Sequence, residues 1–207
     1  MTKEKGTVGE ITPGQMSEFW RQVGIRQIGR DYFQAFLDHR LAERNLFLRL
    51  ISGETLTIDA TDGQDVLVDA RDVFDMIDGD FKGWGADEPG QPTGETIVDV
   101  YEMIKNGALM QMFNSLSSDV RKLCLTQAQI KGFVKKHRQR PQLAGCAALF
   151  LFQSKKTIFK NDPLGDLFIA SASFNSSGGL DVRVHRLENA DVCHAGYRLR
   201  IVAPRLA

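Results

Sequence analysis

The chain has 207 residues, of which 43% are hydrophobic and 25% charged, with equal numbers of basic and acidic side chains. This composition is ordinary for a soluble globular protein of one large or two small domains. No apolar stretch approaches the roughly 18 residues of a membrane-spanning helix, and the polar N-terminus lacks the apolar core of a secretory signal.

The first part of the chain is predicted to be mainly helical. Residues 1–14 are polar and indicate a flexible tail. Apolar side chains at helical spacing predict helices at about 15–23 and 30–41. Two short strands follow, at 46–51 and 56–58, with a turn at Ser52 and Gly53 that favours a hairpin. Asp69 is then placed to cap a helix that runs to about Phe81. Residues 15–82 are therefore expected to form a mostly helical, acidic lobe.

The segment 83–96 is rich in glycine and proline, which predicts either a linker between two lobes or a long surface loop on one domain. Helical spacing returns from Ile97 and continues to Phe113 after an interruption at Gly107. Thr126, with Gln129 three residues later, has the pattern of a capping box. It predicts a helix over 126–139, which Pro141 ends. Residues 97–207 are expected to form either a second lobe or one domain together with 15–82.

The apolar period changes from 3.6 to 2 after residue 140. Strands are predicted at 147–152, 167–174, 180–186 and 197–202, with turn-forming residues between them. Successive short strands of this kind favour an antiparallel meander. The predicted fold class is thus α+β, with a helical N-terminal part followed by a C-terminal antiparallel sheet.

The balanced net charge conceals a separation of charge along the chain. Residues 54–102 contain fourteen acidic side chains and two basic ones, whereas residues 120–161 contain ten basic side chains and no acidic one. The two segments either neutralise each other within the molecule or leave the basic one to face an anionic partner. The sequence leaves both alternatives open.

The helix at 126–139 is one candidate binding surface. Lys131, Lys135 and Arg138 follow one another at helical spacing, on the side opposite Ile130 and Phe133. Such a row could neutralise the phosphates of a nucleic acid. The alternative is a solvated face, or one paired with the acidic segment.

The last two predicted strands supply a second candidate surface. If strands 180–186 and 197–202 pair with each other, Arg183, His185, Arg198 and Arg200 share one face of the sheet. Like charges in such positions are unfavourable unless an anion or an acidic surface meets them. We therefore expect this face to bind a partner, although an ordinary solvated face is an equally open interpretation.

Catalytic, metal and cofactor sites are not predicted. None of the serine hydrolase, zinc protease, phosphate-loop or dinucleotide-binding motifs occurs. The aspartates after Gly53 do not have the spacing of a calcium loop. The three cysteines form no CxxC pair, which argues against a disulfide framework or a thiolate zinc site and fits a reducing, cytoplasmic location.

Several stretches resemble a family of uncharacterised bacterial proteins found in candidate-phylum genomes. The stretches that show the similarity best are FWRQVGIRQIGRDYFQAFL, CLTQAQIKGFVKKHRQR, ALFLFQ and YRLRIVAP, and the resemblance extends over most of the chain. The resemblance implies a bacterial cytoplasmic protein and adds no site residue.

These observations together predict a non-enzymatic binding or adaptor protein. Its partner would be a macromolecule, an acidic protein or a nucleic acid, that meets the basic sheet face or the basic helix. A nucleic-acid-binding protein and an enzyme without a recognisable motif are the alternatives. Contact between the two oppositely charged poles of different copies would give a homo-oligomer.

Overall fold

The computed structural model describes residues 47–51, 55–139, 145–189 and 191–206, all of which belong to one unit, Asn45–Ala207. The tail predicted at 1–14 and the helices predicted at about 15–23 and 30–41 lie outside the described residues.

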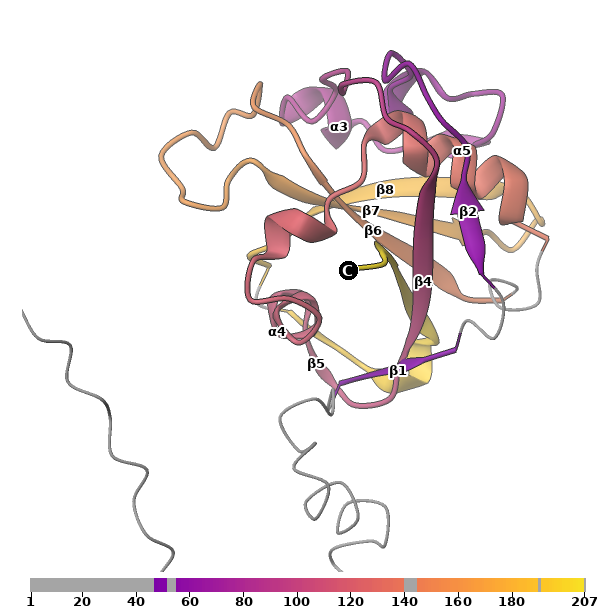
Figure 1. The fold of residues 1–207 in the computed structure, drawn as a ribbon, viewed down its shortest axis with the longest axis vertical. Coiled ribbons are helices and arrows are strands. Elements are labelled where there is room, and N and C mark those ends of the chain that lie inside the picture. The colour runs from indigo at the N-terminus through magenta and orange to yellow at the C-terminus, as the bar shows by residue number, and fades with distance from the viewer. Residues whose placement is uncertain (1–46, 52–54, 140–144, 190, 207) are drawn as a thin grey trace, which may run out of the picture. The chain divides into compact units, whose positions relative to one another are not determined.

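An eight-stranded mixed sheet forms the centre of the described fold (Figure 1). Its strands lie in the order β1-β4-β10-β6-β7-β8-β3, and β2 pairs with β4 as well. The strands are β1 (Leu48–Leu50), β2 (Leu56–Ile58), β3 (Met76–Ile77), β4 (Thr96–Met103), β6 (Ala147–Gln153), β7 (Leu167–Phe174), β8 (Leu180–Arg186) and β10 (Leu199–Pro204). A separate small sheet pairs β5 (Gly107–Ala108) with β9 (Val192–Cys193).

Short helices connect or cover these strands. The α-helices of the described residues are α3 (Asp80–Gly83), α4 (Leu109–Asn114) and α5 (Gln127–His137). Single turns of 3-10 helix occur at η2 (Leu67–Asp69), η3 (Val120–Leu123) and η4 (Ala195–Tyr197). The prediction of a mainly helical first part is therefore wrong for the described residues, in which the sheet dominates.

The segment Thr96–Met103 forms strand β4 where helical spacing from Ile97 predicted a helix, and only the part after Gly107 is helical, as α4. Val98 and Val100 are fully buried on one face of the sheet, and Met103 is buried on the other. A strand with apolar side chains on both faces loses the simple alternation of a half-exposed strand. Its apolar residues can then fit a helical spacing by coincidence, which is the reason for the wrong prediction.

Residues 69–81 do not form the helix predicted from a cap at Asp69. Their aspartates instead bind the backbone of β8, far away in the sequence. The Asp75 carboxylate accepts the N–H of Leu180 at 2.7 Å, and the Asp78 carboxylate accepts the N–H of Val184 at 3.4 Å. Short acidic side chains compete with helical hydrogen bonds in this way. The segment thereby adds the two-residue strand β3 parallel to β8.

The C-terminal strands occur where they were predicted, but their topology differs. Strands β6, β7 and β8 form an antiparallel meander. Strand β10 does not continue it, because it inserts between β4 and β6 and runs parallel to β6. The prediction of a purely antiparallel sheet is therefore wrong. The predicted hairpin of β1 and β2 is also wrong, because each strand pairs with β4 instead.

Two hydrophobic cores lie on opposite faces of the sheet. Helix α5 covers the first with Ile130, Phe133 and Val134, which pack against Phe150 and its neighbours. Helix α4 and the turn η3 cover the second, which contains Met112 and Leu151. Figure 1 shows α5 and α4 on opposite sides of strands β6 to β8.

Residues 83–96 connect parts of the same unit and contact it along their length. Gly85 has a positive φ of 69° and lies so close to the Lys156 carbonyl that a Cβ atom would come within 2.5 Å of its oxygen. The Glu88 carboxylate accepts the N–H of Lys155 at 2.6 Å, and the Gln127 amide donates to the Glu88 carbonyl at 2.9 Å.

Candidate functional site

Helix α5 begins with the capping box that its sequence predicts. The Thr126 hydroxyl accepts the N–H of Gln129 at 3.2 Å, and the Gln129 side chain accepts the N–H of Thr126 at 2.9 Å. These two bonds satisfy backbone donors that the first turn of a helix leaves open. The apolar side of the helix is buried in the first core, so its basic residues lie on the remaining surface.

The lysines of α5 form ion pairs with the acidic segment of the same chain. The Lys131 ammonium lies 2.9 Å from the Asp65 carboxylate and 3.2 Å from that of Asp72, and only 15% of its side chain is exposed. The Lys135 ammonium lies 3.5 Å from Asp72. A fourth pair joins Lys136 to Asp59 at 2.5 Å. The two charged segments therefore meet along α5 and neutralise each other there.

The contact between Lys131 and Asp72 shifts the pKa values of both residues. A hydrogen bond from Lys131 is the largest influence that lowers the pKa of Asp72, and the charges of Lys131 and Lys135 add to it. Burial acts to lower the pKa of Lys131, but its hydrogen bonds with Asp65 and Asp72 outweigh burial and raise that pKa. The ionised forms of both partners are thus favoured together.

The four residues expected on one sheet face are divided between the two faces. Strands β8 and β10 do not pair, because β6 and β7 lie between them. Arg183 pairs with Ser171 of β7, which in turn pairs with Leu149 of β6. Leu149 belongs to the second core, so Arg183 lies on that face. Arg200 lies opposite Ala148, which belongs to the first core. The expectation that Arg183, His185, Arg198 and Arg200 share one face is therefore wrong.

His185 follows Arg183 on the second-core face and is half-buried. Burial is the main cause that lowers the pKa of His185, and the nearby positive charge of Arg183 lowers it further. Asp78 acts in the opposite direction. A neutral imidazole at this position at neutral pH gives no reason to place an anion beside it.

Arg200 lies on β10 directly opposite an acidic residue, Glu102 of β4. Its guanidinium lies 3.9 Å from the Glu102 carboxylate, and 13% of its side chain is exposed. Arg198, two residues earlier, is exposed. Its backbone φ is positive, at 51°, which is uncommon for a residue other than glycine. Arg138 is exposed at the C-terminal end of α5. Within the described ranges no acidic side chain pairs with Arg138, Arg183 or Arg198.

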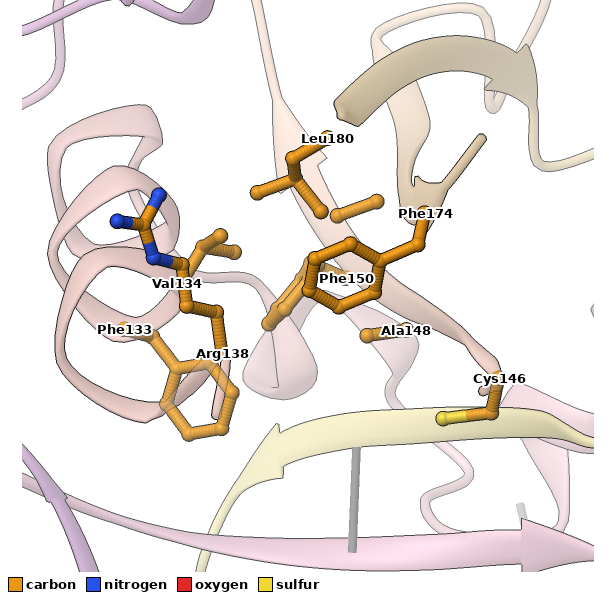
Figure 2. Close-up of a pocket in the computed structure, with 9 residues that line it drawn as sticks. Phe133, Val134, Arg138, Cys146, Ala148, Phe150, Phe174 and Leu180 are labelled. Carbon is orange, nitrogen blue, oxygen red and sulfur yellow. The ribbon is translucent and has the colours of Figure 1, made fainter. Parts of the chain in front are cut away.

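A small apolar hollow, here called the slot, lies beside Arg138 between the end of α5 and the sheet (Figure 2). Figure 2 shows Phe133, Val134 and Arg138 on the helix side, facing Ala148, Phe174 and Leu180 on the strand side. The full lining is Phe133, Val134, Arg138, Cys146, Ala148, Phe150, Ala172, Phe174 and Leu180.

Arginines surround the Cys146 side of the slot. Leu199 pairs with Ala147 in the parallel ladder of β10 and β6, which places Arg198 next to Cys146 along that ladder. Burial raises the pKa of the Cys146 thiol, and the positive charges of Arg200 and Arg198 oppose this rise. Arg138 on the helix side and Arg198 and Arg200 near Cys146 therefore flank the slot on two sides, and we call these three residues the arginine cluster.

Two larger hollows have polar linings whose main groups are already bonded. One, of about 330 Å³, contains Lys131 and Asp65, which pair with each other. The other, of about 340 Å³, contains Gln127 and Gln129. Gln127 accepts the N–H of Leu67, and Gln129 donates to the Thr96 hydroxyl, both at 2.9 Å. These bonds engage Lys131, Asp65, Gln127 and Gln129 within the fold itself.

The cysteines do not have the character of nucleophiles. Burial raises the pKa of Cys124 to about 12 and is also the main cause that raises the pKa of Cys146 and Cys193. Thiols of this kind remain protonated at neutral pH. In the part of the chain that the structure describes, no three histidine, cysteine or acidic residues are grouped so that they could hold a metal ion.

Comparison with models of known protein families gives no match, and neither curated proteins nor solved structures supply one. Among the described residues, no helix combines the length and the apolar character needed to cross a bilayer. The evidence for a binding site is therefore the geometry of the slot and of the arginines beside it. Sequence reasoning identified the three arginines but missed the slot. The sequence feature that could have indicated the slot is Phe174, a large apolar residue directly before a turn, where exposure is expected.

Proposed function

We propose that the protein is a non-enzymatic binding or adaptor protein that docks an acidic macromolecule on the arginine cluster. The observation that carries this proposal is the contrast between two sets of basic residues. Lys131, Lys135 and Lys136 are engaged by aspartates of the same chain. Arg138 and Arg198 are exposed and have no acidic partner among the described residues.

The engaged lysines weaken the case for nucleic acid as the partner. A protein that follows a phosphate backbone needs several free cations in a row. The row on α5 was the best candidate for this role, and its lysines already have carboxylate neighbours. An acidic protein surface needs fewer cations, so it suits the two exposed arginines of the cluster, Arg138 and Arg198, better.

Binding of poly-L-glutamate to the full chain, measured by fluorescence anisotropy at low and moderate salt, tests the proposal. The double variant Arg138→Glu/Arg198→Glu is expected to bind at least about tenfold more weakly, because two favourable contacts become repulsive. A matched control, Arg71→Glu/Lys82→Glu, makes the same change of charge at two exposed positions outside the cluster.

Equal weakening by both double variants would mean that net charge alone attracts the polymer and would overturn the proposal. Tighter binding of a duplex DNA than of poly-L-glutamate, lost in the same cluster variant, would favour the nucleic-acid alternative. Circular dichroism of each variant checks that the fold is retained.

A further inference from the structure

The slot lies inside the arginine cluster, and its origin is visible in the pairing of two strands. Ala148 of β6 and Ala172 of β7 lie directly opposite each other. Larger side chains surround these two alanines, namely Phe150, Phe174 and Leu180. Two small residues side by side beneath a ring of large ones leave a depression, because the neighbouring side chains cannot close over it.

The slot is apolar on its walls and charged on its rim. Phe133 and Phe150 are fully buried, and Cys146 is 7% exposed. Phe174, by contrast, is 42% exposed at the end of β7. Arg138 is the charged residue of the lining. A large exposed aromatic residue beside an unfilled apolar depression is typical of a surface that receives an anchor side chain from a partner.

The size of the slot limits what can enter it. Its interior volume is about 20 Å³, slightly more than one water-sized sphere needs. A nucleobase is too large for this space, and so is an extended acyl chain. The end of one small aliphatic side chain fits it. A carboxylate next to that side chain would lie within the reach of the surrounding arginines.

From this combination we infer that the slot receives a small aliphatic side chain of an acidic protein segment, with a neighbouring carboxylate bound by Arg138 and Arg198. The inference rests on the proposed function and makes it more specific, since it identifies the partner as a protein and names the two chemical groups that it presents. Charge complementarity selects the acidic segment, and the volume of the slot selects the aliphatic residue.

Two short acidic peptides that differ only at a central residue, valine or glycine, test the inference on the full chain by isothermal titration calorimetry. The valine peptide is expected to bind about tenfold more tightly, because its side chain leaves water for an apolar site. The variant Ala172→Val fills the slot and should reduce the ratio of the two affinities to about one. Ser173→Val, a neighbouring change on the other face of β7, should keep the wild-type ratio.

A second variant keeps the test decisive if Ala172→Val does not fold. Phe174→Ser removes a partly exposed wall of the slot and should also reduce the preference for valine. If wild type binds both peptides equally while Arg138→Glu/Arg198→Glu weakens both, the inference is wrong and the proposed function stands. If neither peptide binds, both are wrong.

Other occupants of the slot would give different results. Sedimentation of the chain alone as a dimer that Phe174→Ser dissociates would show that a second copy fills the slot, which would overturn the inference.

Discussion

The ammonium of Lys131 lies 2.9 Å from the carboxylate of Asp65, so that the basic helix α5 is joined to the acidic segment that precedes it by 66 residues. The same ammonium lies 3.2 Å from Asp72. This double contact explains why a chain with strongly separated charges presents little free charge along α5. Arg138, at the C-terminal end of the helix, is exposed instead.

The two lysines that contact Asp72 should contribute unequally to stability. Lys131 is 15% exposed and bonds two carboxylates, whereas Lys135 is 68% exposed and meets one at 3.5 Å. Lys131→Ala should lower the free energy of unfolding by about 1 kcal/mol and Lys135→Ala by less than about 0.5 kcal/mol. Urea denaturation measures both. Equal effects, or a Lys135 effect that persists at high salt, would contradict this explanation.

Acid should remove a stabilising contribution made by Asp166. Arg121 donates two hydrogen bonds to its carboxylate, at 2.7 and 2.9 Å, and this contact is the main cause that lowers the pKa of Asp166. A depressed pKa in the folded state means that the unfolded state binds protons first as the pH falls. The contribution is therefore complete above the unfolded value of about 3.9 and is lost as the pH falls through the lower folded value.

The matching experiment compares wild type with Asp166→Asn by urea denaturation at several pH values. The variant should be less stable at neutral pH by about 1 kcal/mol and should approach wild type below about pH 3. A constant difference between the two proteins over the whole acid range would show that the ion pair is not responsible.

Asp75 should matter more to stability than its exposed neighbours in the sequence. Its carboxylate accepts the backbone N–H of Leu180 at 2.7 Å at the edge of β8. Asp75→Ala would leave this donor unsatisfied and should cost about 1–3 kcal/mol in the free energy of unfolding. The control Asp62→Ala removes an exposed carboxylate whose one hydrogen bond to the described residues is with the nearby N–H of Gln64, and it should change stability by less than about 0.5 kcal/mol.

Phe150 should be the energetically important wall of the slot. Its ring is fully buried and packs edge-on against that of Phe133, with 5.5 Å between the ring centroids. Phe150→Ala should cost about 3–5 kcal/mol in thermal or chemical unfolding. Phe174→Ala, at a position that is 42% exposed, should cost much less. If Phe174→Ala were the more costly change, Phe174 would have to be treated as part of the core.

Local patterns in the sequence predicted the elements that depend on neighbouring residues. Helix α5 follows from Thr126 and Gln129, and strands β6 to β8 follow from alternation between turn signals. Patterns that depend on distant partners misled the prediction. Asp75 and Asp78 serve a strand about a hundred residues away, and β4 is buried on both faces.

The candidate site shows the same limit. Lys131, Arg138 and Arg200 were recognisable as basic residues in a basic region, but their surroundings depend on tertiary structure. Because β10 inserts between β4 and β6, strands β6 and β7 lie between Arg200 and Arg183. The slot requires Ala148 and Ala172 to be opposite each other, a register that no local pattern specifies.

The most direct test compares the two sets of basic residues in one binding experiment. The affinity of an acidic, valine-containing peptide is measured for the neutralised variants Lys131→Gln/Lys135→Gln and Arg138→Gln/Arg198→Gln. Loss of the arginines should weaken binding by about tenfold, while loss of the paired lysines should change it by less than about twofold. Strong weakening in the lysine variant with none in the arginine variant would contradict the proposed function.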